Sequence, residues 1–421
     1  MKDDSAVIIF PSGEVSRLGP RGIKDGEWNK GFLTIANSAK APILPIHIDG
    51  RNSLFFYTLS IVAKPLSTFW LVHEMFKQEN KSIVFTIGEK IEHEIYHQHR
   101  VSSRDKAALF RRHTYMLGAN KAPVFKTQEA IAHPECRQRL HKELRECELL
   151  GETEDNKQIY LFNYRPDTSI MREIGRLREI SFRAVGEGTG KRRDIDKYDS
   201  SYMHLILWDE NDLEIVGAYR LCDTNQAISS TGIEDIYTST LFTYNKAMKP
   251  YLYRGLELGR SFVQPKYWGR RSLDYLWFGI GALLKRNPQY RYLFGPVSIS
   301  NSYPQAAKDL LVYFYSLYFG SEEELVTALT PYQLDWHQRD KLSQHFSGDD
   351  YKKDFTQLKT LLNMHGHSVP TLFKQYTEVT EHGGTVFSDF NIDPDFSDCI
   401  DGFVMVDTEQ LKAKKRRRYI G

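Results

Sequence analysis

The chain has 421 residues, of which 41% are hydrophobic and 26% are charged. This composition supports folded cores and excludes a disordered chain, and the length allows two or three domains. The net charge of +2 argues against a nucleic-acid binder, and no uncharged run is long enough to span a bilayer. The four cysteines are far apart in the sequence, so we expect reduced thiols in a cytosolic protein and no metal site.

The first elements predict an α/β unit. Residues 6–10 are entirely apolar and predict a buried strand, and a polar turn follows from Pro11 to Arg17. Residues 42–48 predict a second buried strand. Two such strands separated by a polar turn and a helix are typical of α/β proteins.

These residues also carry a family resemblance. Phe10-Pro11-Ser12-Gly13-Glu14 resembles the Phe-Pro-Glu-Gly motif of the glycerolipid (lysophospholipid) acyltransferases, and residues 41–46 resemble that family's later proline motif. The resemblance implies that Phe10, Pro11, Gly13 and Glu14 help to hold the phosphate of an acceptor. We expect residues 1–118 to form a partial domain of this kind.

The catalytic motif of that family, His-x4-Asp, lies upstream of the motifs just described. Only nine residues precede Phe10, and no His-x4-Asp follows in this region. If the chain is the whole protein, we expect the first domain to be inactive as an O-acyltransferase. If it is a piece, the missing part carried that chemistry. Both alternatives stay open.

The next region leads to the domain boundary. Residues 53–76 are rich in Leu, Phe, Tyr and Trp, and we favour helices that pack in a core over a membrane-contact surface. Residues 82–88 predict a strand and residues 101–119 a helix with basic faces. A further helix is expected from His133 to Leu150, so that residues 119–158 form a helical linker.

The second domain begins with a strand at residues 159–162. An amphipathic helix follows from Met171 to Ala184, with Ile174 and Leu177 on its inner face and Arg178 outside it. Residues 192–199 form an acidic loop, because three carboxylates occur in six residues without a hydrophobic period. Residues 204–208 and 215–221 then predict two strands of a hairpin.

The central stretch is a strand, a basic turn and a helix. Residues 256–263 predict the strand and residues 273–280 begin the helix, and a further strand is expected at 292–299. A Gly-bearing basic turn before a helix favours a phosphate site, since free N–H groups and the positive end of the helix dipole meet there. An ordinary exposed basic turn is the alternative. The candidate phosphate-binding residues are Val263, Lys266, Gly269, Arg270 and Arg271.

The order of these elements resembles the GNAT acyltransferase fold with its mixed central sheet, over residues 159–410. Within it, four segments resemble the ornithine-acyl-ACP N-acyltransferases, namely residues 194–199, 217–221, 257–260 and 293–295. The acidic loop and the Glu257/Arg260 strand also resemble the acyl-homoserine-lactone synthases. One departure concerns the pyrophosphate loop of the fold, in which Arg271 replaces a small residue. A single phosphate on an acyl-carrier-protein arm fits this loop at least as well as coenzyme A.

A glycerolipid acyltransferase domain fused to such an N-acyltransferase resembles the bifunctional ornithine-lipid synthases. The resemblance implies transfer of a 3-hydroxyacyl chain from acyl carrier protein to ornithine, followed by acylation of the hydroxyl by the N-terminal half. Because the His-x4-Asp motif is missing here, we expect the N-terminal half of this chain to be inactive. The resemblance also implies acyl-carrier protein (a phosphopantetheine thioester) or acyl-CoA as donor, no tightly bound cofactor, and a peripheral location at the inner face of the bacterial membrane. The expected partners are acyl carrier protein, ornithine and an anionic membrane surface.

Roles for individual residues follow from this chemistry. The amine acceptor must lose a proton, for which Glu257, on the strand before the basic turn, is the first candidate base and Asp196 the second. Arg260, or alternatively Arg220, is expected to hold the acceptor carboxylate. Asp194 and Asp199 are expected to hold the side-chain ammonium of ornithine. The alternative is a structural ion pair between Glu257 and Arg260. His204 is expected to be a core histidine.

The tail is less informative. Residues 321–365 predict helices, and residues 411–421 contain a basic run from Lys412 to Arg418. This run is either a solvated, disordered tail or an arm attracted to anionic lipid or carrier protein.

Two other functions stay open for the whole chain. One is a GNAT enzyme that uses acetyl-CoA or acyl-CoA on another small amine, which detectable CoA binding would favour. The other is a non-catalytic membrane-associated module.

Overall fold

A computed structural model describes residues 6–19, 22–79, 82–98, 101–125 and 127–421. The chain divides into two compact units, Met1–Ala130 and Ile131–Gly421. Among the described residues, no helix combines the length and the apolar character needed to cross a membrane.

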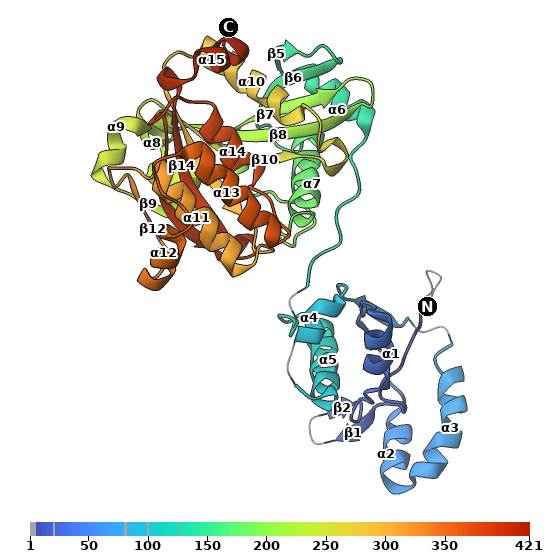
Figure 1. Cartoon of the computed structure of the whole chain (residues 1–421). Coiled ribbons are helices and arrows are strands. Elements are labelled where there is room, and N and C mark those ends of the chain that lie inside the picture. Colours follow the sequence, from blue (N-terminus) through green and yellow to red (C-terminus); the bar gives the residue numbers. More distant parts are fainter. Residues whose placement is uncertain (1–5, 20–21, 80–81, 99–100, 126) are drawn as a thin grey trace. The chain divides into compact units, whose positions relative to one another are not determined.

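The first unit combines short strands with helices (Figure 1). Its strands form two antiparallel pairs, β1 with β2 and β3 with β4. Its core contains Phe32, Leu33, Tyr96, Phe110 and Phe125. The elements are β1 (Arg17–Gly19), β2 (Gly22–Lys24), α1 (Gly31–Ala39), β3 (Ile46–Asp49), α2 (Leu54–Val62), α3 (Lys64–Phe76), β4 (Val84–Ile87), α4 (His93–Gln98) and α5 (Ser103–Gly118).

Several expectations for the first unit need correction. Residues 6–10 form no strand and are exposed, with Ile8 at 83% and Phe10 at 71%, because no described strand pairs with them. The second strand exists as β3 but begins at Ile46, and its apolar side chains are exposed rather than buried. The favoured core interpretation of residues 53–76 is wrong for Val62 and Phe69, which are 86% and 82% exposed. The strand at residues 84–87 and the helix α5 are confirmed.

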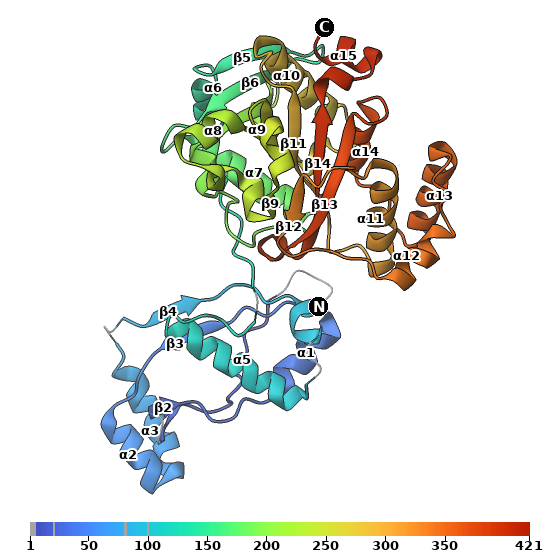
Figure 2. The ribbon, with the colours of Figure 1, turned by 90° about the vertical axis from the view of Figure 1, so that its left-hand side faces the viewer.

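The second unit is built on one mixed sheet of eight strands in the order β13-β14-β11-β10-β8-β7-β6-β5 (Figures 1 and 2). Among the described strands of this sheet, only the pair β10–β11 is parallel, and this confirms the mixed sheet expected for the second domain. The strands of the sheet are β5 (Glu148–Glu152), β6 (Lys157–Asn163), β7 (Met203–Asp209), β8 (Glu214–Asp223), β10 (Gly255–Val263), β11 (Tyr292–Ile299), β13 (Thr385–Asp393) and β14 (Cys399–Asp407). A separate pair is β9 (Phe242–Tyr244) with β12 (Val326–Ala328). The helices are α6 (Arg137–Leu144), α7 (Ser169–Arg183), α8 (Thr224–Ser230), α9 (Lys249–Leu252), α10 (Ser272–Arg286), α11 (Gln305–Phe319), α12 (Trp336–Ser343), α13 (Tyr351–Met364), α14 (Thr371–Glu378) and α15 (Ala413–Tyr419).

The two faces of the sheet differ in chemistry. Side chains alternate along a strand, so Leu205, Leu221 and Leu258 face α10 in one core, whereas Ile206 and Ala218 face α7 in another. The face toward α7 also carries polar groups, among them His204, Arg220 and Glu257, which are all buried. Buried ionisable groups on a sheet face mark this side as the candidate site.

Two irregularities shape the centre of the sheet. Strands β10 and β11 pair only from Gly255 to Glu257, opposite Tyr292 to Phe294, and the ladder then stops although both strands continue. We call the unpaired stretches of β10 and β11 beyond these pairs the strand gap. In addition, the pairing of β10 with β8 shifts between Gly259 and Phe262, and Arg260 at this β-bulge has a positive φ of 47°. Bulges and strained backbone of this kind are frequent next to functional sites.

Most elements predicted for the second unit are confirmed, including β6 to β8, β10, β11, α7 and α10. The helix expected to reach Leu150 is shorter: it ends at Leu144, and Glu148–Glu152 forms β5 at the edge of the sheet. Residues 321–365 contain the helices α12 and α13 but also the strand β12. The basic run is an ordered helix, α15, rather than a disordered tail.

Candidate functional site

The basic turn lies between β10 and α10, as predicted. Lys266 contacts Asp212 at 3.4 Å and also Glu214, so its charge is matched by acids of the β7–β8 hairpin. Gly269 has a φ of 75° and open space around its Cα, and Arg270 and Arg271 are exposed. No side chain of the described residues caps the N-terminus of α10. The first N–H groups of this long helix are therefore free for an anion at the mouth of the turn.

The acidic loop forms a buried ion-pair network with three arginines. Asp199 contacts Arg178 at 2.7 Å and Arg220 at 3.3 Å. Asp196 contacts Arg220 at 2.6 Å and Arg260 at 3.6 Å. Burial raises the pKa of the Asp199 carboxyl, but Arg178 and Arg220 outweigh burial and hold that pKa well below its usual range. The carboxylate therefore stays ionised inside the protein.

The structure brings Asp194 into the same network. Its carboxylate lies 3.1 Å from Arg260, and it is buried like Asp199. The carboxylates of Asp194 and Asp199 already pair with arginines, and such pairs hold neighbouring elements together. These pairs favour that structural role over contact with an ornithine ammonium.

Glu257 is fully enclosed. Its carboxylate accepts hydrogen bonds from the Thr238 N–H at 2.7 Å, the Thr238 hydroxyl at 2.6 Å and the Tyr237 N–H at 3.3 Å. The Tyr202 hydroxyl donates a further short bond. Burial raises the pKa of Glu257, although the bonds from Thr238 and Tyr202 act in the opposite direction. Glu257 thus fixes the turn at residues 237–238 against β10.

The two candidate carboxylate-binding arginines differ in their free donors, because among the described residues Arg260 leaves only one buried nitrogen, Nε, without a hydrogen bond, whereas Arg220 leaves two. Arg260 pairs with Asp194 and Asp196 and donates to the Tyr237 hydroxyl at 3.0 Å. Arg220 uses Nη1 for the two ion pairs, while its Nε and Nη2 are buried without a partner among the described residues. These two nitrogens lie on one edge of the guanidinium, which is the arrangement that a carboxylate accepts in a two-pronged contact.

A second acidic group lies on the other side of the strand gap. Asp401 on β14 is opposite Ser298 on β11, and its Oδ1 accepts a hydrogen bond from the Ser298 hydroxyl at 2.6 Å. Among the described residues, no donor binds its Oδ2. Burial raises the pKa of Asp401 to about 6, while Ser298 and the nearby Arg260 act to lower it. Burial and Asp401 together raise the pKa of the half-buried Glu187 to about 8.

Sequence reasoning missed Arg178, Asp401 and Tyr237. Arg178 was expected outside the inner face of α7, yet it is fully buried. The signal was available, since Arg178 follows Ile174 by four residues and therefore shares its helical face. An isolated Asp401 within the apolar strand of residues 399–407 was a comparable signal. The short turn that contains Tyr237 shows no pattern that would have identified it.

His204 is a buried core histidine, as expected. Because it is buried, we predict that the folded state becomes less stable in acid. Its Nδ1 lies 3.3 Å from Arg178 Nη2, and burial together with Arg178 lowers the pKa of His204 to about 3. Between pH 6.5 and about 3 the unfolded chain therefore binds a proton at this residue that the folded chain does not. We expect this difference to lower the free energy of unfolding by up to about 1.4 kcal/mol per pH unit as the pH falls through this window.

The measurement is chemical denaturation at a series of pH values for the wild type and His204→Gln, because glutamine cannot titrate. Groups that do not interact with His204 contribute equally to both proteins, so the difference in slope reports mainly on His204. Parallel pH dependences in the two proteins would contradict the prediction.

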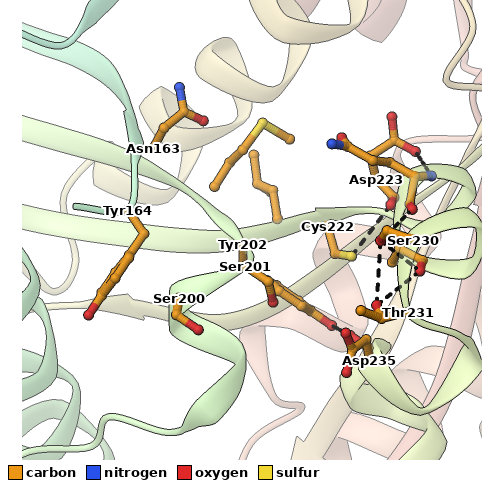
Figure 3. A pocket seen from close by; sticks show the side chains of 14 residues that line it. Asn163, Tyr164, Ser200, Ser201, Tyr202, Cys222, Asp223, Ser230, Thr231 and Asp235 are labelled. Carbon is orange, nitrogen blue, oxygen red and sulfur yellow. Dashed lines mark hydrogen bonds between the residues drawn. The ribbon is translucent and has the colours of Figure 1, made fainter. Parts of the chain in front are cut away.

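A pocket of about 350 Å³ lies beside Tyr202 and Cys222 (Figure 3). Its lining includes the carboxylates of Asp223 and Asp235 and several hydroxyl groups, and no Lys or Arg is among its described lining residues. Since Tyr202 also binds Glu257, the pocket adjoins the buried network. Its chemistry suits an amine or hydroxyl group better than a carboxylate.

In the first unit, the motif at residues 10–14 forms a turn. The Gly13 N–H donates to the Phe10 carbonyl at 3.2 Å, and the φ of Gly13 is 65°. Glu14 pairs with Arg17 at 3.1 Å. The role of Phe10, Pro11, Gly13 and Glu14 in holding an acceptor phosphate stays a prediction.

Comparisons with known proteins match both units. An acetyltransferase (GNAT) domain model matches residues 177–278, and an acyltransferase model matches residues 1–122. The glycine N(alpha)-acyltransferase of Bacteroides thetaiotaomicron is 35% identical over 305 residues, which are 69% of this chain and 90% of that protein. The lyso-glycine lipid O-acyltransferase of the same organism is 38% identical over 21% of this chain and 35% of that protein. The L-ornithine N(alpha)-acyltransferase of Brucella abortus is 33% identical over 30% of this chain and 50% of that protein.

Proposed function

The chain belongs to the family of the glycine N(alpha)-acyltransferases and is an acyltransferase, and we propose that its second unit transfers a 3-hydroxyacyl chain from acyl carrier protein to the α-amine of an amino acid. The product is a lyso-amino-acid lipid. The observation that carries the proposal is the strand gap, because its β10 side leads directly into the basic turn and the N-terminus of α10.

The strand gap fits the arm of the donor. Strands β10 and β11 continue beyond Glu257 and Phe294 without pairing to each other, so an extended chain that carries amides has main-chain groups to bind on both sides. A phosphopantetheine arm is such a chain, and its phosphate then meets the basic turn. N–H groups near the Arg260 bulge are suited to meet the oxyanion that develops on the thioester carbonyl.

The amino acid requires a carboxylate contact, for which we propose Arg220. We expect Arg220→Lys to raise the KM for the amino acid at least about ten-fold and to leave the KM for the donor unchanged, because lysine keeps the charge but lacks two parallel donors. Steady-state kinetics with the amino acid and with its decarboxylated amine test this. Discrimination between the two acceptors should fall in the variant, and unchanged discrimination would exclude this role.

The acceptor ammonium must lose a proton before it attacks. Glu257 has hydrogen-bond donors on both oxygens, and Asp196 is paired with two arginines, whereas Asp401 keeps Oδ2 open beside the gap. We therefore propose Asp401 as the proton acceptor and Glu257 as a positioning residue. The amine forms the C–N bond, the C–S bond breaks, and the leaving thiolate takes up a proton, so that one proton is released overall.

Two amino acids are candidates for the acceptor. The resemblance of residues 194–199, 217–221 and 257–260 implies ornithine, and the relative matched over 90% of its length is named for glycine. The pocket beside Tyr202 offers the carboxylates of Asp223 and Asp235 for the second ammonium of ornithine. Glycine has no second ammonium and would not use these carboxylates.

For the first unit, we propose that residues 1–130 alone do not complete the O-acylation step. They contain no His-x4-Asp, which is the catalytic motif of the family they resemble. The exposed apolar side chains of α2 and α3, such as Val62 and Phe69, support contact between this unit and the surface of a membrane. This contact fits a peripheral location at the inner face of a bacterial membrane.

The experiment is acyl transfer by the purified chain from 3-hydroxyacyl carrier protein to glycine or ornithine, with lipid products identified by mass spectrometry. A lyso product with either amino acid supports the proposal and names the acceptor, and a diacylated product would contradict the proposed inactivity of the first unit. Transfer from CoA thioesters to another small amine would favour the general GNAT function. No transfer from any donor by folded protein would exclude an N-acyltransferase.

A further inference from the structure

The basic helix α15 packs firmly on α10. The buried Tyr419 lies against Trp277 and Phe278, with ring centroids 5.7 and 5.5 Å apart. Its hydroxyl donates to Asp274 at 2.9 Å. At Gly281 an added Cβ would lie 2.0 Å from the Tyr419 carbonyl oxygen, so the two helices approach through a glycine. Both ribbon views show α15 beside α10 (Figures 1 and 2).

The charge of α15 is almost unmatched. The run from Lys412 to Arg418 contains six cations and no acid. Among the described residues, only Arg418 of these six has a carboxylate partner, Asp274. Lys414 and Arg417 are exposed and line an open hollow with Ala413 and Arg418. An exposed surface with excess positive charge attracts an acidic partner from a distance.

This surface is joined to the phosphate turn. Asp274, in the first turn of α10, contacts Arg418 of α15 and lies 3.8 Å from Arg271 of the basic turn. Arg270, which precedes Arg271 in the basic turn, stacks on Tyr267 and has no carboxylate partner among the described residues. The basic turn and α15 therefore form one continuous surface, which we call the α15 surface and define by Arg270, Arg271, Lys414, Arg417 and Arg418.

The chemistry of the donor identifies the occupant. In an acyl carrier protein, the phosphate of the arm is esterified directly to a side chain of the carrier. A phosphate bound at the N-terminus of α10 therefore brings the body of the carrier against the neighbouring elements, and α15 is the basic one among them. We propose that the α15 surface is the docking site for an acidic acyl carrier protein. This inference rests on the proposed function, since it assumes a carrier-bound donor.

The test compares donors. We expect the double variant Lys414→Glu/Arg417→Glu to raise the KM for acyl carrier protein at least about ten-fold, because two attractive contacts become repulsive. Transfer from acyl-pantetheine, which has neither phosphate nor carrier, should stay unchanged. Binding of holo carrier protein, measured by fluorescence titration, should weaken by a similar factor and should lose most of its salt dependence.

The matched control is Lys353→Glu on α13, an exposed lysine on a helix that packs on α11 rather than on α10. It should behave as the wild type. Equal losses with acyl-CoA and with carrier protein would assign the surface to a nucleotide and overturn the proposal. So would loss of binding to phosphatidylglycerol vesicles with an unchanged KM for carrier protein. The titration is independent of turnover, so failure of docking and failure of the proposed function are distinguishable.

Discussion

Replacement of Asp401 by asparagine is expected to lower kcat for acyl transfer by about 10²–10⁴-fold, the usual contribution of a positioned proton acceptor. The pKa of Asp401 is raised to about 6, so the wild type should lose activity as the pH falls through 6 and this carboxylate becomes protonated. We call this fall in rate at low pH the acid limb of the pH–rate profile, and the Asp401→Asn variant should lack it. Initial rates between pH 5 and 9 measure both effects, and the titration of the amine itself is common to both proteins.

Ser298→Ala is the matched control for Asp401. The Ser298 hydroxyl lowers the pKa of Asp401, so its removal should move the acid limb to higher pH and keep most of the activity at alkaline pH. Thermal unfolding should show no loss of stability in Asp401→Asn, because asparagine removes a buried charge and still accepts the bond from Ser298. An acid limb that is unchanged in both variants would exclude Asp401 as the proton acceptor.

Glu257→Gln is expected to lower kcat/KM at least about 100-fold, the loss that a displacement of about 1 Å near the reacting groups can cause. The carboxylate accepts four hydrogen bonds, two of them from Thr238. In Glu257→Gln, the NH₂ group of the glutamine faces a hydrogen-bond donor of the protein, so one of these two donors is left unpaired. An unpaired buried donor costs about 1–3 kcal/mol of stability. The measurement is lyso-lipid formation, with thermal unfolding to confirm that the variant folds.

Thr238→Val separates positioning from proton transfer at Glu257. It removes one donor and keeps the carboxylate. If Glu257 positions the turn at residues 237–238, both variants lose activity and both keep the acid limb at the wild-type pH. If the acid limb is lost in Glu257→Gln but kept in Thr238→Val, Glu257 is the base instead.

Much of the second unit follows from local patterns in the sequence. The hairpin of β7 and β8, the strand β10, the helix α10 and the strand β11 have clear periods of hydrophobic residues and polar turns between them. The edge strand β5 and the strand β12 were missed, because short strands leave little periodic signal. In the first unit, residues 6–10 have a strand-like composition, but a strand forms only where a partner strand accepts its hydrogen bonds.

The sequence predicted most residues of the candidate site, but not which of them contact one another. The motifs around Asp196, Arg220, Glu257 and Arg260 were all visible, and the structure brings them together on one face of the sheet. Which arginine keeps free donors depends on three-dimensional contacts with Asp194 and Tyr237 that no spacing encodes. Asp401 lies more than 100 residues from these motifs, and only the order of strands places it across the gap from Arg260.

The bulge in β10 explains an unusual spacing. Along a regular strand, residues three apart point to opposite faces, so Glu257 and Arg260 would be separated by the sheet. The extra residue between Gly259 and Phe262 resets the alternation, and both side chains reach Tyr237 on the same face. A Glu-x-x-Arg pattern inside a strand-forming segment is therefore a readable mark of a bulge. In a distant relative, loss or gain of one residue in this segment would indicate that the polar centre has been dismantled.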